Sequence, residues 1–199
     1  MRVFRILSAG LAIALPVAAA AQYEAPVNPP DPAAHIAEMT ALYEQVCLTA
    51  FPDADAVARA VAERGAVPLS PQEVQAYLHD DPGRGWRIAG ATARFDVTIE
   101  DPPYHACGVR TMTAAGFPDL APYRAVADRY EAGGNYQRIG PVTMNLGSVV
   151  SSGGGEGRQR DGGNETLLVF NTTPAEGQRG NGQTGVEVRF VHQITRRQR

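Results

Sequence analysis

The segment Trp86–Met112, WRIAGATARFDVTIEDPPYHACGVRTM, decides the fold, because here the spacing of apolar residues becomes that of β-strands. In its middle, FDVTIE at 95–100 alternates apolar and polar residues, which predicts a half-buried strand with one face in water. Apolar runs at 86–89 and 104–112 predict further strands on either side, and the prolines of 101–103 end the middle strand. Consecutive strands with such short breaks favour an antiparallel sheet.

Four helices and three more strands are predicted around this segment. Apolar residues at helical spacing place the helices at 36–51, 53–65, 70–78 and 119–132. The helix at 70–78 has the clearest start, because Ser70 is followed by Pro71 and Glu73 in the pattern of a capping box. The remaining strands are expected at 142–146, 167–170 and 186–190. This order predicts the α+β class, with a single antiparallel sheet of five to six strands and helices packed on it.

The first 21 residues are typical of a cleaved signal peptide, with Arg2 and Arg5 at the start and small residues at Ala19–Ala21. The apolar run between them has a proline inside and falls short of the roughly 20 residues that a membrane span needs. We therefore expect a mature protein in the periplasm or outside the cell, with no membrane span. The predicted divisions are a signal peptide at 1–21, an extended leader at 22–34, one α+β domain at 35–195 and a basic tail at 196–199.

The two cysteines, Cys47 and Cys107, are predicted to form a disulfide, because an even number of cysteines in an exported chain favours pairing. The bond would join the N-terminal helices to the sheet and stabilise the fold by roughly 4 kcal/mol. The alternative is that Cys107 is a nucleophile with His105 as its base, since residues two apart on a strand share a face. That role requires a reduced thiol and a third group that orients the base.

The composition excludes several functions. All 18 basic residues are arginine, so a lysine Schiff base and a phosphate-loop lysine are both excluded. The bias towards arginine, alanine and glycine is typical of bacterial genes rich in GC. Removing the signal peptide leaves 16 arginines against 21 acidic residues, a net charge of −5. A nucleic-acid-binding protein would carry a strongly basic face, so we expect no nucleic-acid partner.

Two glycine-rich polar segments, 151–164 and 172–185, are predicted to be long loops. They carry Arg158, Arg160 and Arg179, which could contact an acidic ligand or envelope component. The alternative is that both loops are solvated and mobile, with no ligand.

Two other motifs have simple structural explanations. The sequence GNGQTG at 180–185 matches the dinucleotide fingerprint, but a strand follows it where a helix would be needed, so no cofactor is expected. His79-Asp80-Asp81 could bind a metal or share a proton, but a histidine at a helix end also suits the helix dipole. The histidines lack the spacing of a zinc site, and no metal is expected.

The stretches Tyr77–Trp86 (YLHDDPGRGW) and Tyr104–Arg110 (YHACGVR) resemble a group of exported bacterial proteins with no assigned activity. The resemblance extends over about residues 40–150, and it implies export and paired cysteines. It supplies no catalytic residues.

We therefore expect an exported periplasmic protein that acts by binding, because no complete set of catalytic residues is present. The alternative is a small envelope enzyme of the hydrolase type. It would use His79 with Asp80 or Asp81, or His105 with Cys107.

Overall fold

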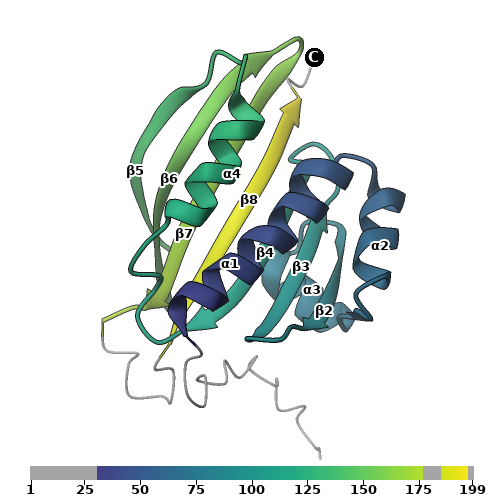
Figure 1. Ribbon diagram of the computed structural model, residues 1–199, viewed down its shortest axis with the longest axis vertical. Coiled ribbons are helices and arrows are strands. Elements are labelled where there is room, and N and C mark those ends of the chain that lie inside the picture. The colour runs from purple at the N-terminus through teal and green to yellow at the C-terminus, as the bar shows by residue number, and fades with distance from the viewer. Residues whose placement is uncertain (1–30, 177–184, 197–199) are drawn as a thin grey trace, which may run out of the picture.

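The computed structural model describes residues 31–176 and 185–196, which form one antiparallel eight-stranded sheet with helices on both faces (Figure 1). The helices are α1 (Pro32–Tyr43), the π-helix η1 (Glu44–Ala50) that continues it, α2 (Ala54–Ala62), α3 (Pro71–Leu78) and α4 (Ala121–Glu131). The strands are β1 (Val67–Pro68), β2 (Gly83–Ala89), β3 (Arg94–Glu100), β4 (Ala106–Thr113), β5 (Gln137–Asn145), β6 (Val149–Arg160), β7 (Gly163–Pro174) and β8 (Val186–Arg196). Their order across the sheet is β1-β2-β3-β4-β8-β7-β6-β5.

The predicted count of five to six strands is wrong, although the antiparallel sheet and the six strands expected from the sequence are present. The two additional strands are the short β1 and the long β6, which occupies most of the segment 151–164 that was expected to be a loop. Glycines make up much of β6, so it lacks the apolar alternation on which the prediction depended. Its residues are held by backbone pairing with β5 on one side and β7 on the other.

One face of the sheet is covered by α1, η1 and α4, and the main core lies beneath them (Figure 1). Asp31 begins α1, since its side chain accepts a hydrogen bond from the backbone of Ala33, so the last residues of the expected extended leader at 22–34 are helical. The largest fully buried side chains of this core include Met39 and Tyr43 from α1, and Phe95 and Phe190 from the sheet.

The opposite face of β2 and β3 is covered by α3 (Figure 1). The capping box at the start of α3 is confirmed, because Glu73 accepts a hydrogen bond of 2.8 Å from the backbone of Ser70. The expected water-facing side of β3 is instead buried: Asp96 is 4% exposed. Its carboxylate accepts hydrogen bonds from Tyr77 of α3 at 2.7 Å and from Arg87 of β2 at 2.9 and 3.0 Å. The alternation identified the two faces correctly but could not show that a helix covers the polar one.

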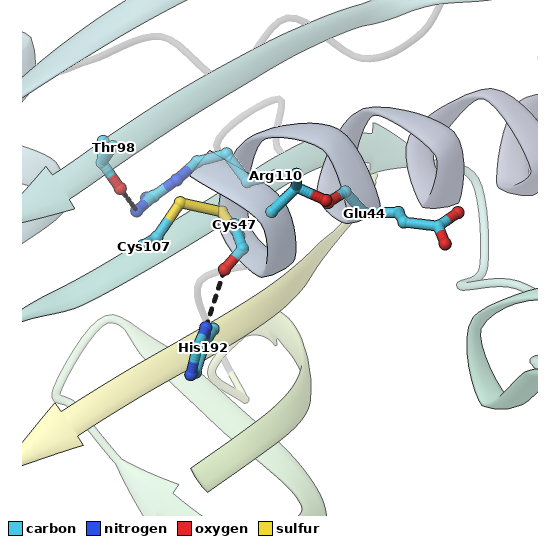
Figure 2. Close-up of a disulfide and its surroundings, with 7 residues drawn as sticks. Glu44, Cys47, Thr98, Cys107, Arg110 and His192 are labelled. Atoms are coloured by element: carbon cyan, nitrogen blue, oxygen red, sulfur yellow. Dashed lines mark hydrogen bonds between the residues drawn. A yellow bond between two sulfur atoms is a disulfide. The ribbon is translucent and has the colours of Figure 1, made fainter. Parts of the chain in front are cut away.

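The predicted disulfide between Cys47 and Cys107 is present, with a Cα–Cα distance of 5.3 Å (Figure 2). It joins η1 to β4 and so attaches the N-terminal helices to the middle of the sheet. Arg196, expected as part of a basic tail, is the last residue of β8. In the described ranges, no helix is both long and apolar enough to cross a membrane.

Candidate functional site

A cleft of about 310 Å³ lies where the β6–β7 hairpin, the end of β8 and the chain before β4 meet. The side chains with chemical interest in it are basic: His105, Arg160 and Arg196. The other residues that line it are Pro52, Asp161, Gly162, Gly163, Asn164, Ile194 and Thr195. Asp161 is the only acidic residue among these lining residues.

The strand register places the two arginines on either side of a glycine. Gly163 pairs with Arg160 of β6 and with Arg196 of β8, and side chains of register partners point to the same face. The turn between β6 and β7 is formed by Asp161 and Gly162, the second of which has a φ of 79°, a conformation that glycine adopts easily. Position 163 has no room for a side chain, since a Cβ there would lie 1.8 Å from the carbonyl oxygen of Thr195 on β8.

His105 enters the cleft from the loop before β4. Its backbone carbonyl accepts a hydrogen bond of 2.8 Å from Ile194, which fixes the loop to β8. Its ring contacts the Phe51 ring edge-to-face, with centroids 4.6 Å apart. Burial lowers the pKa of His105, and the positive charge of Arg196 lowers it further. The imidazole of His105 is therefore neutral at neutral pH, and it binds a proton less readily than an ordinary histidine side chain.

A buried carboxylate, Glu165, lies directly behind Arg160 and is 0% exposed. One of its oxygens accepts hydrogen bonds from Tyr130 at 2.8 Å and lies 2.9 Å from Nε2 of His192. The other accepts hydrogen bonds from Arg158 at 2.8 and 2.7 Å, and Nη1 of Arg160 lies 3.4 Å away. Burial alone would raise the pKa of Glu165, but the bonds from His192, Tyr130 and Arg158 outweigh it and hold that pKa well below its usual range. The carboxylate is therefore ionised and anchors both arginines.

His192 lies between this carboxylate and Cys47 of the disulfide. Figure 2 shows its contact with the Cys47 carbonyl. Its Nδ1 lies 2.7 Å from the carbonyl oxygen of Cys47, and it is the register partner of Cys107 on the neighbouring strand. Both partners of the ring, a carbonyl and the Glu165 carboxylate, can only accept hydrogen bonds. The ring of His192 is therefore the donor towards both groups, and it connects β8 to η1 and to Glu165.

The three arginines that the sequence analysis named as possible ligand contacts lie in different environments. Arg158 donates to the buried Glu165 and so has a structural partner inside the protein. Arg160 lines the cleft, with its side chain 46% exposed. Arg179 lies outside the described residues. The glycine-rich segment around the first two is a strand and hairpin, which holds Arg160 in a defined position.

The residues of the predicted enzyme do not converge in one place. Asp80 and Asp81 are exposed and line a different cleft beside Trp86, and His79 is exposed at the end of α3 in a left-handed conformation. His105 lines the basic cleft, whereas Cys107 is bound in the disulfide and has no thiol to act as a nucleophile.

The sequence analysis did not identify Glu165 and His192 as site residues. Glu165 lies on β7, just before the strand expected at 167–170, and His192 lies on β8, just after the strand expected at 186–190. The signal was available in the alternation: Glu165 is two residues from the buried Leu167, and His192 is two residues from the buried Phe190. A polar residue at the inward positions of a strand must find partners inside the protein. That rule would have placed both side chains in the interior.

The arrangement as a whole offers a basic, partly open cleft supported by a buried charged network, which suits the binding of an anion. Comparisons with protein-family models, with curated proteins and with solved structures found no match for this chain.

Proposed function

We propose that the protein is exported to an oxidising compartment, the periplasm or the cell exterior, and binds an anionic ligand there in the cleft between the β6–β7 hairpin and β8. The single observation that carries this proposal is the placement of Arg160, Arg196 and His105 around one cleft that has a single acidic lining residue, Asp161. Arginine donates in a planar fork that matches carboxylate and phosphate groups, so two guanidinium groups beside a glycine suit such a ligand.

The buried network supports this function by holding the cleft in shape before the ligand arrives. Arg160 is near Glu165, which also binds side chains from α4, β6 and β8. A binding site whose residues are already positioned loses less conformational entropy when the ligand binds. Export is supported by the disulfide, since such bonds persist in oxidising compartments, and by the signal-like composition of residues 1–21.

The proposal is tested with sulfate, whose charge is constant above pH 4, and with a short polyglutamate peptide as an acidic polymer. Titration of the purified, oxidised protein at low salt, followed by NMR, is expected to give saturable shifts of His105 and of the residues near Arg196. Arg196→Gln should weaken binding about ten- to hundredfold, because a hydrogen bond to a charged group contributes roughly 1.5–3 kcal/mol. The matched control is Arg124→Gln, which removes an exposed arginine on α4 outside the cleft.

The pH dependence provides a second test. Burial and the charge of Arg196 lower the pKa of His105, so its ring is protonated only below the usual pKa range of histidine. The positive charge that the ring then carries favours the binding of an anion. Sulfate affinity should therefore rise as the pH falls below the usual pKa range of histidine, and His105→Gln should remove most of that rise. Binding that neither variant weakens, or no saturable binding of either probe, would overturn the proposal.

A further inference from the structure

The sheet has two edges that differ sharply in length. One edge is β1, which has only two residues, of which one is a proline. The other is β5, with nine residues that are exposed except for Ile139. A long edge strand offers unpaired backbone groups to another strand, and proteins usually block such edges with short strands, charges, prolines or bulges.

β5 is blocked only in its first half. Its pairing with β6 shifts between Ile139 and Val142, and Pro141 lies within that bulge. The segment Val142–Leu146, VTMNL, then pairs regularly up to the hairpin. This segment holds three of the five exposed large hydrophobic residues among those described: Val142 (44% exposed), Met144 (36%) and Leu146 (46%).

The hydrogen bonds of the hairpin show which backbone groups are open. Leu146 donates its N–H to the carbonyl of Val149 on β6. Because backbone groups alternate along an antiparallel strand, Met144 is also directed to β6, whereas the N–H and C=O groups of Thr143 and Asn145 are directed to the open edge. Within the described residues, no strand pairs with β5 on that side.

We propose that the segment Val142–Leu146 pairs with the same segment of a second copy of this chain, in an antiparallel arrangement centred on Met144. In this register Thr143 lies opposite Asn145 of the partner subunit, and Asn145 lies opposite the partner's Thr143. The backbone groups of these residues that point to the open edge therefore form hydrogen-bonded pairs. It also puts Val142 opposite the partner subunit's Leu146 on a single face. The pattern apolar-polar-apolar-polar-apolar is the same in both directions, as a two-fold interface requires.

The charges favour a like partner at this edge. The chain carries a formal net charge of −3, so two copies repel each other over much of their surfaces. No charged residue occurs from Ile139 to Gly155, and this edge is therefore a place where like copies meet without repulsion. A basic or acidic partner protein would find no complementary charge there.

The size of the contact makes the dimer weak. Five residues a side cover much less than the roughly 800 Å² per partner of a stable interface. The association is therefore expected in the range of tens to hundreds of micromolar, and it must be measured over a concentration series.

Sedimentation velocity of the purified, oxidised protein from about 10 μM to 1 mM should show the change from monomer to dimer. Met144→Lys puts two positive charges opposite each other on the two-fold axis and should keep the protein monomeric throughout. Thr143→Pro removes an N–H that is directed away from β6, so it should also prevent dimerisation while the fold is kept. The matched control is Val67→Lys, at the other edge of the sheet, where the side chain is 60% exposed; it should dimerise like the parent.

Amide hydrogen exchange identifies the edge that pairs. The amides of Thr143 and Asn145 should exchange more slowly as the protein concentration rises, whereas that of Met144 should be slow at all concentrations. A monomer over the whole range would overturn the proposal, and so would a dimer that survives Met144→Lys or is lost with Val67→Lys. Protection of Thr143 and Asn145 in the dilute monomer would also overturn it, because the edge would then be covered within a single chain.

Discussion

A single carboxyl group, that of Glu131, gives the stability of this protein a dependence on pH. Glu131 is the last residue of α4, and one of its oxygens is buried with no hydrogen-bond partner. Burial raises its pKa to about 7, and the negative charges of Glu156 on β6 and of Asp128 add to the effect. The negative end of the helix dipole at this position acts in the same direction.

Because this pKa is raised on folding, the folded state keeps a proton that the unfolded chain releases between about pH 4.5 and 7. The free energy of unfolding should therefore fall as the pH rises through this window. Glu131→Gln removes the effect, and we expect it to stabilise the protein by about 1 kcal/mol at pH 8 and by almost nothing at pH 4, with allowance for the partial exposure of the group. Urea unfolding at the two pH values measures the difference.

Glu63→Gln serves as the control for this experiment, because Glu63 is exposed beyond the end of α2. It shares the position at a helix end but is exposed, so the difference between its effects at the two pH values should be clearly smaller than that of Glu131→Gln. If Glu131→Gln changed the free energy of unfolding by the same amount at pH 4 as at pH 8, folding would leave the pKa of this carboxyl group unchanged, and the assignment would be wrong.

At the level of single residues, the sequence predicted a bonding partner only where few candidates exist. It could not predict a hydrogen-bond partner that the pairing of two strands brings close. Cys47 and Cys107 were the only possible disulfide pair, and that prediction is confirmed. Arg158 was considered a possible ligand contact, and in the structure it donates to Glu165, seven residues away across the hairpin. That contact exists only because β6 and β7 pair, and the sequence did not indicate that β6 was a strand.

At the level of elements, β6 is the longer of the two strands that the sequence did not predict. Hydrophobic alternation reports side chains that must be buried, and Gly153, Gly155 and Gly157 have none. These positions are instead selected by close approach to β7. A Cβ at Gly155 would lie 1.9 Å from the carbonyl oxygen of Leu167, and one at Gly153 would lie 2.1 Å from that of Val169. The glycines that predicted a loop are therefore what this strand requires.

Gly155→Ala should destabilise the protein, because the backbone of β7 must move to accommodate the added methyl group. Overpacking of this kind costs about 1–3 kcal/mol, which urea unfolding measures directly. Gly140→Ala on the neighbouring β5 is the matched control, since a Cβ there meets no atom within 4 Å, and we expect a change of at most about 0.5 kcal/mol. Equal effects of the two substitutions would show that the close approach of β6 and β7 does not constrain position 155.

For the molecule as a whole, the single antiparallel sheet with helices packed on it followed from the sequence, whereas the number of strands and their order did not. Alternation predicted six strands and their inward faces, but it carries no information about which strands are neighbours. The central pairing joins β4 to β8, whose register partners include Cys107 and His192. This pairing brings together the two halves of the sheet, and it places His105, just before β4, in the cleft that Arg160 and Arg196 also line. A prediction of the site therefore needed a long-range contact that local patterns do not specify.

The disulfide lies at this junction, and its removal tests how much the whole molecule depends on it. The bond closes a loop of 60 residues between η1 and β4, so it restricts the unfolded chain strongly. In the chain-entropy model, removing the bond lowers the free energy of unfolding by roughly 4 kcal/mol. This is a large part of the roughly 5–15 kcal/mol that stabilises a typical domain. Replacing Cys47 and Cys107 together by serine should lower the urea midpoint accordingly.

Urea unfolding in the presence of a reductant distinguishes the effect of breaking the disulfide from the effect of replacing the two cysteine side chains. Reduction should destabilise the parent protein by a similar amount and leave the double serine variant unchanged. His192 still donates to the carbonyl of Cys47 in both cases, so η1 keeps one attachment to the sheet and the native fold should persist, with lower stability. A loss of less than about 1 kcal/mol would mean that the unfolded chain is already restricted without the bond, since the stabilisation arises mainly from restricting that state. The hydrogen bonds and packing around His192 would then be sufficient to hold the helices on the sheet.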